Sequence, residues 1–379
     1  MTRRRVFISC YFPRSVALEG VGTLVCGFSR AFTCAGWDVT LLLPQGEYAV
    51  SDATVEMYRP GLFGVAGLPR YYRAVGRLSA LADVTLLVES SPALGASVSC
   101  VADLARARAL FYLPLQTSSV LREIGLSRQA LVHWAGMHRL WARRIDWRDK
   151  HCVVGSEFQV RQMRALHCGH VDVLPVSGVS RDATVLSRSA ARRRLGWDDQ
   201  PVVGYLGHYS RAKGVDVLVE AFAKVRGAGV LALAHSGRGE LTSRGRAALA
   251  SLRAQGRVRE LGVCEPLNFL AACDVVALPY ITSSICHQPQ VLLESLAAST
   301  AVVTTALGGF AELLSQGPCG WVIRPRDVDA LASALAGALA DLPALHATGQ
   351  RGRTVFEASC ASERMVAYMD EIVARASRP

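Results

Sequence analysis

Short apolar runs rich in β-branched residues alternate along the chain with longer segments whose apolar positions recur at helical spacing. In the N-terminal half the strand-like runs are residues 5–10, 39–43, 84–88, 109–113, 152–154 and 171–175. A helical pattern fills 21–35, between the first two runs. This alternation is typical of βα units, which build a parallel sheet with helices on both faces.

The segment 177–200 interrupts the pattern with Ser, Asp and Arg residues and a Trp-Asp-Asp turn, so we expect it to connect two domains. We expect the arginines at 192–194 to be solvated on a helix of this connection. A second series follows. Its expected strands are 202–206, 230–235, 258–261, 275–278, 302–305 and 321–323, and its expected helices are 215–225, 291–298, 328–342, 345–355 and 362–376. The pattern predicts an α/β fold of two doubly wound, Rossmann-like domains that face each other across a cleft. We place them at residues 1–180 and 181–360, and expect the last helix, 361–379, to cross back to the first domain.

Composition fits a folded protein of this size. Of the 379 residues, 51% are hydrophobic and 19% are charged, which argues against a disordered chain. The formal net charge of +11 leaves polyanions, an anionic membrane surface and small anionic substrates open, although Arg-rich codon usage explains the excess equally well. No nucleic-acid recognition motif accompanies the charge, so nucleic-acid binding is not expected.

The eleven cysteines are scattered and never form C-x-x-C, which argues against a disulfide framework or a zinc site. No run approaches about 18 uninterrupted apolar residues, and the first apolar run is too short for a signal peptide. We therefore expect a cytoplasmic protein.

Common nucleotide-binding motifs are missing, but glycines follow two of the predicted strands, and basic residues accompany them in the second case. Neither a P-loop nor a dinucleotide fingerprint is present. Gly20 and Gly22 open the first helix, where they either cap a loop or let a ligand approach the backbone closely. In the second series, a strand ends at Gly207 and is followed by Arg211, Lys213 and a helix, as a diphosphate site requires.

Glu294 lies on a helix whose other residues are apolar. A buried carboxylate without hydrogen-bond donors is costly, and ribose hydroxyls would supply such donors. Asp327 and Asp329 form an Asp-x-Asp pattern, but they begin a helix, where Asp is a common N-cap, so we interpret Asp327 as a cap and expect no metal site.

These blocks, in this order, resemble the family-4 retaining glycosyltransferases of the GT-B fold. Supporting blocks are 20–42, 153–157, 173–179, 258–263 and 320–327. The resemblance implies that the C-terminal domain holds a nucleotide-diphosphate sugar and that the N-terminal domain contacts the acceptor. It implies no cofactor beyond that co-substrate.

The resemblance also implies roles for individual residues. Lys213 matches the lysine that neutralises the diphosphate, and Glu294 matches the second Glu of the family's Glu-x7-Glu element, which contacts the ribose. His208 stands where the family usually has Arg, and we expect Arg211 to compensate.

Two parts of the family pattern are absent from this sequence. Cys286 replaces the first Glu of the Glu-x7-Glu element and Pro289 replaces the following Gly, so we expect His287 and Gln288 to take over sugar recognition. The family's N-domain His is also missing, and Gln116 or Glu89 is expected to approach the sugar instead. The full predicted set is Lys213, Arg211 and Glu294 as catalytic residues, Gly207, His208, Gly262, Val263, Cys286, His287, Gln288, Gln290, Glu294 and Gly309 for the donor, and Gly20, Gly22, Glu89 and Gln116 on the acceptor side.

The expected reaction is glycosyl transfer with retention to a small-molecule acceptor, such as an aminocyclitol or another secondary metabolite. Two alternatives stay open: a membrane-associated glycosyltransferase of envelope lipids or polysaccharides, and a non-catalytic protein that binds sugar nucleotides. The stretch 130–148 bears on the first alternative, because it combines Trp134, Trp141 and Trp147 with four arginines, and its apolar positions recur at helical spacing. It is interpreted as a core-packed surface helix or as a peripheral membrane contact.

Overall fold

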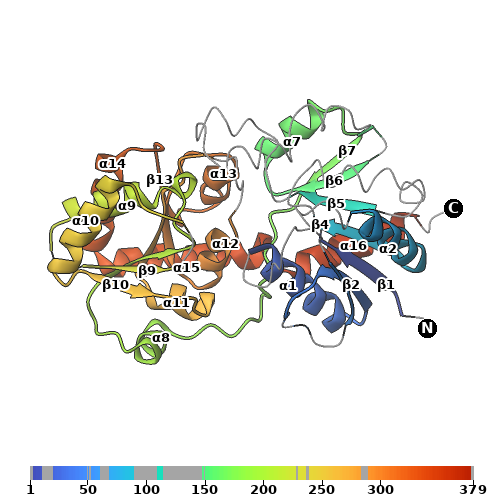
Figure 1. Ribbon diagram of the computed structural model, residues 1–379, viewed down its shortest axis with the longest axis horizontal. Helices are drawn as coiled ribbons and strands as arrows, with labels where there is room; N and C mark the ends of the chain where they lie inside the picture. Colours follow the sequence, from blue (N-terminus) through green and yellow to red (C-terminus); the bar gives the residue numbers. More distant parts are fainter. Residues whose placement is uncertain are drawn as a thin grey trace. The chain divides into compact units, whose positions relative to one another are not determined.

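The computed structural model describes residues 3–10, 20–48, 50, 53–59, 68–88, 109–113, 147–148, 150–227, 229–235, 239–282 and 289–376. The chain forms two compact units (Figure 1). Unit 1 comprises residues 1–181, 286–290 and 359–379, and unit 2 comprises residues 182–285 and 291–358. Each unit has its own parallel sheet.

Unit 1 contains a seven-stranded parallel sheet in the order β3-β2-β1-β4-β5-β6-β7. The strands are β1 (Arg5–Ser9), β2 (Asp38–Pro44), β3 (Thr54–Tyr58), β4 (Val84–Val88), β5 (Ala109–Leu113), β6 (His151–Val154) and β7 (His170–Val173). The described helices of this unit are α1 (Gly20–Cys34), α2 (Leu68–Leu81), α7 (Glu157–Arg164) and α16 (Glu363–Ala376).

Both faces of the unit 1 sheet are covered at its centre, which explains why β1 and β4 are buried along nearly their whole length, whereas the edge strands β3 and β7 are more polar. Successive residues of β1 point to opposite faces: Val6 and Ile8 pack in a core with α1 and α16, whereas Phe7 packs in a second core with α2 and α7. The C-terminal helix α16 contributes Met365, Val366 and Met369 to the first core, beside α1 (Figure 1). The last helix of the chain is therefore an integral part of unit 1.

Unit 2 contains a six-stranded parallel sheet in the order β10-β9-β8-β11-β12-β13. The strands are β8 (Val202–Leu206), β9 (Val230–Ala234), β10 (Val258–Leu261), β11 (Val275–Leu278), β12 (Ala301–Thr305) and β13 (Gly320–Ile323). The helices are α8 (Arg188–Leu195), α9 (Val215–Lys224), α10 (Ser243–Ala254), α11 (Pro266–Ala272), α12 (Gln290–Ala297), α13 (Gly309–Ser315), α14 (Val328–Ala340) and α15 (Leu342–Ser359), with a short 3-10 helix at Arg211–Lys213.

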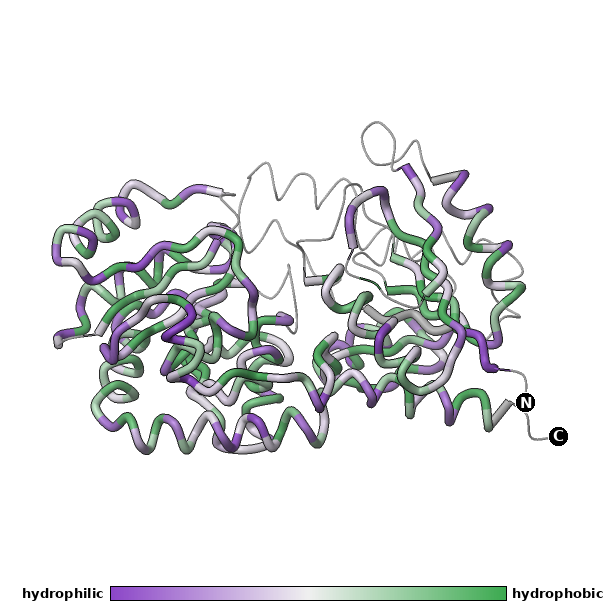
Figure 2. Tube along the Cα trace, turned by 90° about the horizontal axis from the view of Figure 1, so that it is seen from below, coloured by the Kyte–Doolittle hydropathy of each residue, from purple (hydrophilic) through white to green (hydrophobic). Residues whose placement is uncertain are grey.

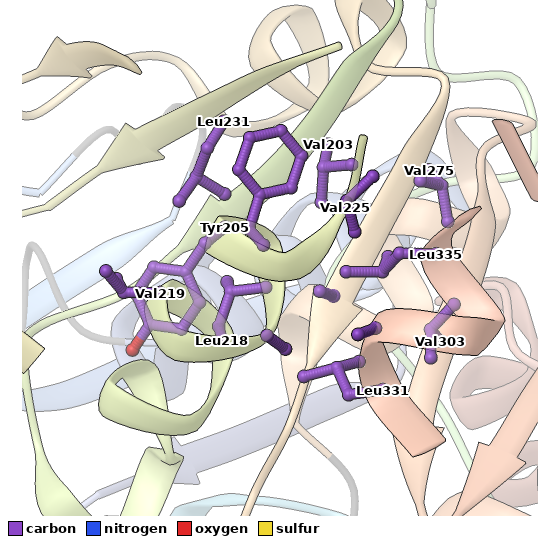
Figure 3. Close-up of a cluster of buried hydrophobic side chains, with 14 of the residues drawn as sticks. Val203, Tyr205, Leu218, Val219, Val225, Leu231, Val275, Val303, Leu331 and Leu335 are labelled. Atoms are coloured by element: carbon purple, nitrogen blue, oxygen red, sulfur yellow. The ribbon is translucent and has the colours of Figure 1, made fainter. Parts of the chain in front are cut away.

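A continuous apolar core joins α9, α10 and α14 to one face of the unit 2 sheet (Figure 3). Leu218 and Val219 of α9 meet Val203 and Tyr205 of β8, and Leu331 of α14 lies in the same cluster. Hydrophobic positions lie mainly in the interior of each unit, and hydrophilic positions recur along the outer helices (Figure 2). Burial of this apolar surface is the main driving force for forming each sheet.

The predicted strands are present in the described residues, with shifts of one or two residues at their ends. Strand β3 and the helices α2, α7, α10, α11 and α13 were not predicted from the sequence pattern. The α/β fold class with two doubly wound parallel sheets is confirmed.

One expectation for the connecting segment was wrong. The arginines at 192–194 were expected to be solvated on a helix between the domains, but Arg192 of α8 is only 8% exposed and donates a hydrogen bond to the Asp274 carboxylate at 2.6 Å. Arg193 and Arg194 are exposed, as expected. Helix α8 packs against α11, and the Trp197 ring that follows it lies edge-on to Phe269, so this part of the segment is a layer of unit 2.

Of the tryptophan-rich stretch 130–148, the structure describes Trp147 and Arg148, and the rest lies outside the described residues. Trp147 is not helical; it is 1% exposed and packs with Val154 and Met163 in the second core of unit 1. Within the part of the chain that is described, no single helix is long and apolar enough to cross a membrane. The helical segments 328–340 and 342–374 are together long and apolar enough for a membrane span, but a bend of 104° separates them.

Candidate functional site

The strand order of unit 2 marks where a ligand would bind. Strand β8 pairs with β9 on one side and with β11 on the other. The strands β9 and β10 are added on one side of β8 and the strands β11 to β13 on the other, so the strand order reverses at β8. In open parallel sheets of this kind, ligands bind outside the carboxyl ends of the strands at such a switch point. The residues after Leu206 and after Leu278 are therefore the first place to look.

The loop after β8 folds back over the strand end and places a cation there. Gly207 has φ +149, and a β-carbon at this position would lie 3.0 Å from Lys213 Nζ. Glycine is thus needed both for the backbone conformation and for the approach of the lysine. The hydroxyl of Tyr205 donates to the His208 carbonyl at 2.9 Å, which fixes the first part of the loop.

The far end of the same loop is tied to β11. Gly214 has φ +70, and its Cα lies so close to Pro279 that a β-carbon would be 1.8 Å from the Pro279 carbonyl oxygen. The Ile281 amide donates to the Ala212 carbonyl at 3.0 Å. The loops after β8 and β11 therefore form one structure that presents Lys213 and the start of α9, whose first amides have no partner within the helix. Arg211 is exposed beside them.

Glu294 is a buried carboxylate on α12. Its side chain is 4% exposed and makes no hydrogen bond or ion pair with any residue that the structure describes. Burial, followed by the nearby negative charge of Glu265, raises the pKa of Glu294 to about 7. A carboxylate in this state has unused capacity to accept hydrogen bonds.

Glu265 was not singled out in the sequence, although it shapes this site. Its carboxylate caps α11 by accepting hydrogen bonds from the amides of Leu267 and Asn268, at 3.1 Å and 2.6 Å. The Glu-Pro pair at 265–266 is a signal for a helix start that could have located it. Its effect on Glu294 depends on the folded structure and has no local signal.

The carboxyl ends of β11 and β12 are tied together beside this loop. Thr305 donates from its hydroxyl to the Tyr280 carbonyl at 2.8 Å, and the Phe310 ring packs edge-on to the Tyr280 ring at 5.2 Å. Between them Gly308, with φ +49, turns the chain so that α13 begins at the buried Gly309. The predicted donor residue Gly309 thus lies at the same edge of the sheet as the loop after β8.

Gly262 and Val263 follow β10 at the same carboxyl edge, two strands from β8. A β-carbon at Gly262 would meet no atom within 4 Å, and Val263 is 64% exposed. An aliphatic side chain this exposed offers an apolar surface to a planar group.

The side chain of Gln290 is already engaged within unit 1. Its Oε1 accepts from the Ser177 hydroxyl and from the Gly178 amide, both at 3.3 Å. A β-carbon at Gly20 would lie 3.4 Å from Gln290 Cγ, so Gly20 faces this side chain. Gly22 is buried inside α1. These contacts explain Gly20 as a packing position as well as the start of a helix.

The remaining predicted site residues, Cys286, His287, Gln288, Glu89 and Gln116, lie outside the described residues. Asp327 caps α14, as expected, by accepting from the Ala330 amide at 2.8 Å, and Asp329 pairs with Lys224 at 2.6 Å. Among the described side chains, no group of three or more His, Cys, Asp or Glu residues is placed to hold a metal ion.

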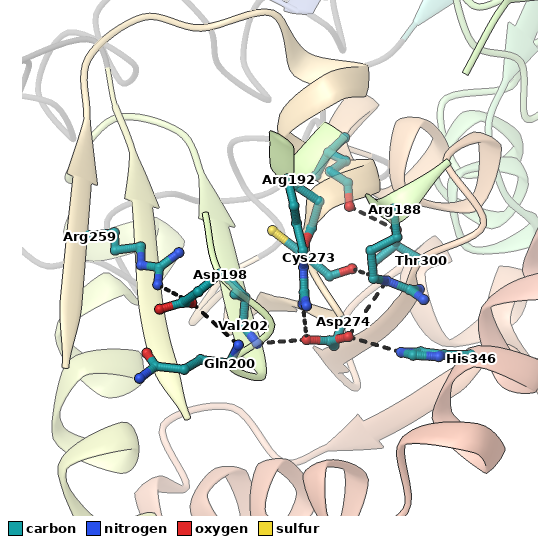
Figure 4. Close-up of polar contacts among 12 residues, drawn as sticks. Arg188, Arg192, Asp198, Gln200, Val202, Arg259, Cys273, Asp274, Thr300 and His346 are labelled. Atoms are coloured by element: carbon teal, nitrogen blue, oxygen red, sulfur yellow. Dashed lines mark hydrogen bonds and ion pairs between the residues drawn. The ribbon is translucent and has the colours of Figure 1, made fainter. Parts of the chain in front are cut away.

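A second polar cluster lies among the amino ends of β8 and β11, away from this site (Figure 4). Asp274 is 2% exposed and accepts from Arg192, the Val202 amide and His346 Nε2, at 2.6, 2.7 and 2.9 Å. Arg188 lies 3.5 Å from the same carboxylate. The cluster joins α8, β8 and α15, and its role is structural.

Comparison with known proteins is consistent with this geometry. Residues 200–341, which contain the loop after β8 and Glu294, match the family model described as Glycosyl transferases group 1. This segment is a group 1 glycosyltransferase domain.

Curated relatives match part of the chain. A D-inositol 3-phosphate glycosyltransferase of Mycobacterium avium (strain 104) is 30% identical over 212 residues, which cover 52% of this chain and 47% of the relative. Another, of Stackebrandtia nassauensis, is 32% identical over 217 residues, which cover 50% of this chain and 46% of the relative. The matched part spans about half the length of these relatives.

Solved structures match the whole chain. Sucrose-phosphate synthase from Thermosynechococcus elongatus superimposes with a TM-score of 0.74 and 18% identity over 99% of both chains. Anabaena HepE in complex with UDP-glucose gives a TM-score of 0.68 and 17% identity over 98% of this chain and 99% of that chain. The likeness establishes that the group 1 domain belongs to a protein of the GT-B fold.

Proposed function

We propose that this protein is a retaining glycosyltransferase that moves a sugar from a nucleotide-diphosphate sugar to a hydroxyl group of a small polar acceptor. Glu294 carries the proposal, because it is a buried carboxylate with unused hydrogen-bonding capacity in the group 1 domain. Two ribose hydroxyls would donate to it and compensate for its burial.

Lys213 and Arg211 are the proposed diphosphate ligands. Two observations support this assignment: Lys213 Nζ lies beside Gly207 at the strand end, and the first amides of α9, which could donate to a phosphate, follow in the same loop. In the transfer step the bond from the anomeric carbon to the phosphate oxygen breaks and a bond to the acceptor oxygen forms. The acceptor proton passes to the departing phosphate oxygen, whose growing negative charge the two cations stabilise.

The other donor contacts follow from their place at the same edge. We assign His208 and Gly309 to the phosphate and sugar side, and Gly262 with the exposed Val263 to the base. Structures of HepE with UDP and UDP-glucose support a nucleotide-sugar donor of this chemical class. The predicted sugar contacts of Cys286, His287 and Gln288, and the acceptor-side roles of Gly22, Glu89 and Gln116, stay predictions.

The proposed acceptor is a cyclitol, including an aminocyclitol, or another secondary metabolite. The curated relatives are named for transfer to D-inositol 3-phosphate, which is a cyclitol phosphate, and the net charge of +11 suits an anionic substrate. A location in the cytoplasm remains part of this proposal.

A panel of nucleotides and nucleotide sugars tests the donor half of the proposal by thermal shift, because a ligand bound only by the folded state raises the melting temperature. At least one of the uridine, guanosine, thymidine and adenosine diphosphates should stabilise the protein, and Glu294→Gln should abolish that shift. Glu357→Gln is the control, since Glu357 pairs with Arg353 on α15. If none of the four diphosphates stabilises the wild-type protein, the proposal is wrong.

Transfer itself is tested by incubating the stabilising nucleotide sugar with inositol phosphates and aminocyclitols and determining the anomeric configuration of the product by NMR. Inversion at the anomeric carbon would contradict retention. Nucleotide binding without transfer or donor hydrolysis in a single turnover would instead support a non-catalytic sugar-nucleotide-binding protein.

A membrane-associated enzyme is the second candidate. The chain is similar in fold to WaaG, a glycosyltransferase involved in lipopolysaccharide biosynthesis, with a TM-score of 0.69 and 17% identity. Co-sedimentation with anionic vesicles that persists at moderate salt would favour this candidate and a peripheral membrane contact. Failure to sediment would count against both.

A further inference from the structure

Two cysteines of unit 1, Cys152 and Cys168, share one packed cluster on one face of the sheet, outside the group 1 domain. Cys152 is the second residue of β6 and is fully buried. Cys168 lies in the turn between α7 and β7 and is partly exposed. Parallel pairing sets His151 beside His170 and Cys152 beside Val171, so the turn that carries Cys168 leads directly into the neighbouring strand.

The backbone holds the Cys168 sulfur over this strand pair. Cys168 Sγ lies 3.3 Å from the His170 carbonyl oxygen and 3.5 Å from the Lys150 carbonyl oxygen. These carbonyls belong to the start of β7 and to the residue before β6, so they bracket the position of Cys152. Cys168 also packs against the buried apolar cluster of unit 1 that contains Cys152.

The turn itself is fixed. The Cys168 amide donates to the Met163 carbonyl at 3.1 Å, and the Gly169 amide donates to the Trp147 carbonyl at 3.0 Å. Gly169 packs so closely on Arg148 that a β-carbon would be 1.9 Å from the Arg148 carbonyl oxygen. The turn therefore holds Cys168 in a defined position against the cluster that contains Cys152.

The two thiols differ in a way that suits sequential chemistry. The hydrogen bond from Cys152 lowers the pKa of the Cys168 thiol, whereas the same hydrogen bond and burial raise the pKa of the Cys152 thiol well above its usual value. The thiolate is the reactive form of cysteine. Cys168 thus combines access to solvent with the more acidic thiol, and Cys152 lies behind it.

We propose that Cys152 and Cys168 are a redox modification site that forms a reversible disulfide by exchange with a small disulfide such as oxidised glutathione. The Cys168 thiolate attacks one sulfur of glutathione disulfide, breaks its S–S bond and releases one glutathione thiolate. Cys152 then loses its proton and attacks the Cys168 sulfur of the mixed disulfide, which expels the second glutathione thiolate. The two cysteines are oxidised by two electrons, glutathione disulfide is reduced by two electrons, and the two released protons leave on the two glutathione thiols.

The bond would close the chain around α7 and tie β6 to the turn before β7. Its neighbour in β6 is His151, whose Nε2 lies 2.7 Å from the Asp172 carboxylate and 2.7 Å from the Tyr368 hydroxyl of α16. Oxidation would therefore stiffen the strand pair on which the C-terminal helix rests.

Peptide mapping tests the proposal on the full chain. The protein is incubated with oxidised glutathione, free thiols are alkylated, and the proteolytic peptides are analysed by mass spectrometry without reduction. We expect a peptide pair joined through Cys152 and Cys168, with the loss of two alkylatable thiols, both restored by dithiothreitol. Cys34→Ser is the matched control, because Cys34 is exposed at the end of α1 and its loss should leave the cross-link unchanged.

Two variants separate the steps. Cys168→Ser should abolish the cross-link and leave Cys152 unmodified by glutathione. Cys152→Ala should instead trap glutathione on Cys168, because the resolving thiol is gone. The proposal is overturned if the wild-type protein keeps a stable glutathione adduct on Cys168, if Cys168 joins another cysteine, or if neither thiol reacts while Cys34 does.

Discussion

Lys213 Nζ lies against the Cα of Gly207, where a β-carbon would be 3.0 Å from that nitrogen. The residue at the end of β8 therefore determines where the cation of the loop is held. Because the amine is the flexible end of its side chain, it can move away from a larger residue, but the backbone at φ +149 cannot relax as easily.

Gly207→Ala should consequently weaken both folding and nucleotide binding. Backbone strain at a position suited to glycine should lower the free energy of unfolding by about 1–3 kcal/mol. Displacement of the amine should reduce the affinity for a nucleoside diphosphate roughly tenfold, which corresponds to about 1.4 kcal/mol. Urea unfolding and calorimetric titration measure the two effects. Gly337→Ala is the control: a β-carbon within α14 would meet no atom within 4 Å, so this change should stabilise the protein by about 0.5–1 kcal/mol.

The Asp274 cluster predicts a large loss of stability from a small chemical change. Asp274→Asn removes a buried negative charge that faces Arg192, itself 8% exposed, and Arg188. Leaving a buried charge without its partner costs about 3–5 kcal/mol, which urea unfolding would detect. Asp198→Asn, which breaks an exposed ion pair with Arg259, should change stability little. Equal effects of the two changes would contradict the structural role of the cluster.

Glu294 should make the stability of the unliganded protein depend on pH. Because burial raises its pKa from 4.5 to about 7, the folded protein binds this proton more tightly than the unfolded chain does. The resulting stabilisation is fully present below about pH 4.5 and is lost as the pH rises through about 7. Glu294→Gln cannot ionise, so its stability relative to wild type should rise by up to about 3 kcal/mol from acidic to alkaline pH.

Chemical unfolding of both proteins across that pH range provides the measurement. A difference between variant and wild type that stays constant with pH would show that Glu294 has an ordinary pKa. Adding a stabilising nucleoside diphosphate should reduce the pH dependence, because donors to the carboxylate favour its ionised form.

Tyr368 should anchor the C-terminal helix to unit 1. Its hydroxyl donates to the Asp172 carboxylate at 2.5 Å. Tyr368→Phe should therefore lower the free energy of unfolding by about 1 kcal/mol and speed amide hydrogen exchange in α16. Tyr209→Phe is the control, since the Tyr209 hydroxyl is buried and has no hydrogen-bond partner among the described residues. That change should leave exchange in α16 unaltered.

The glycine and lysine of the β8 loop could be predicted from sequence because a strand, a turn and a helix start follow one another within a short segment. Glu294 could be predicted for a similar reason, as a single carboxylate within an apolar helix. The partner of Arg192 could not, since Asp274 lies 82 residues away and only folding brings the two together. The influence of Glu265 on Glu294 was missed for the same reason: local patterns locate helix caps and loops, while electrostatic pairing depends on packing.

The position of α16 in the core of unit 1 has a consequence for synthesis of the protein. Residues 182–285 and 291–358 complete unit 2 while Met365, Val366 and Met369 are still to be translated. The face of the first sheet that these three residues cover thus stays open until they have been translated, although its strands are made first. The N-terminal unit therefore cannot complete its core before the segments of unit 2 have been made, and part of its apolar surface stays uncovered during synthesis.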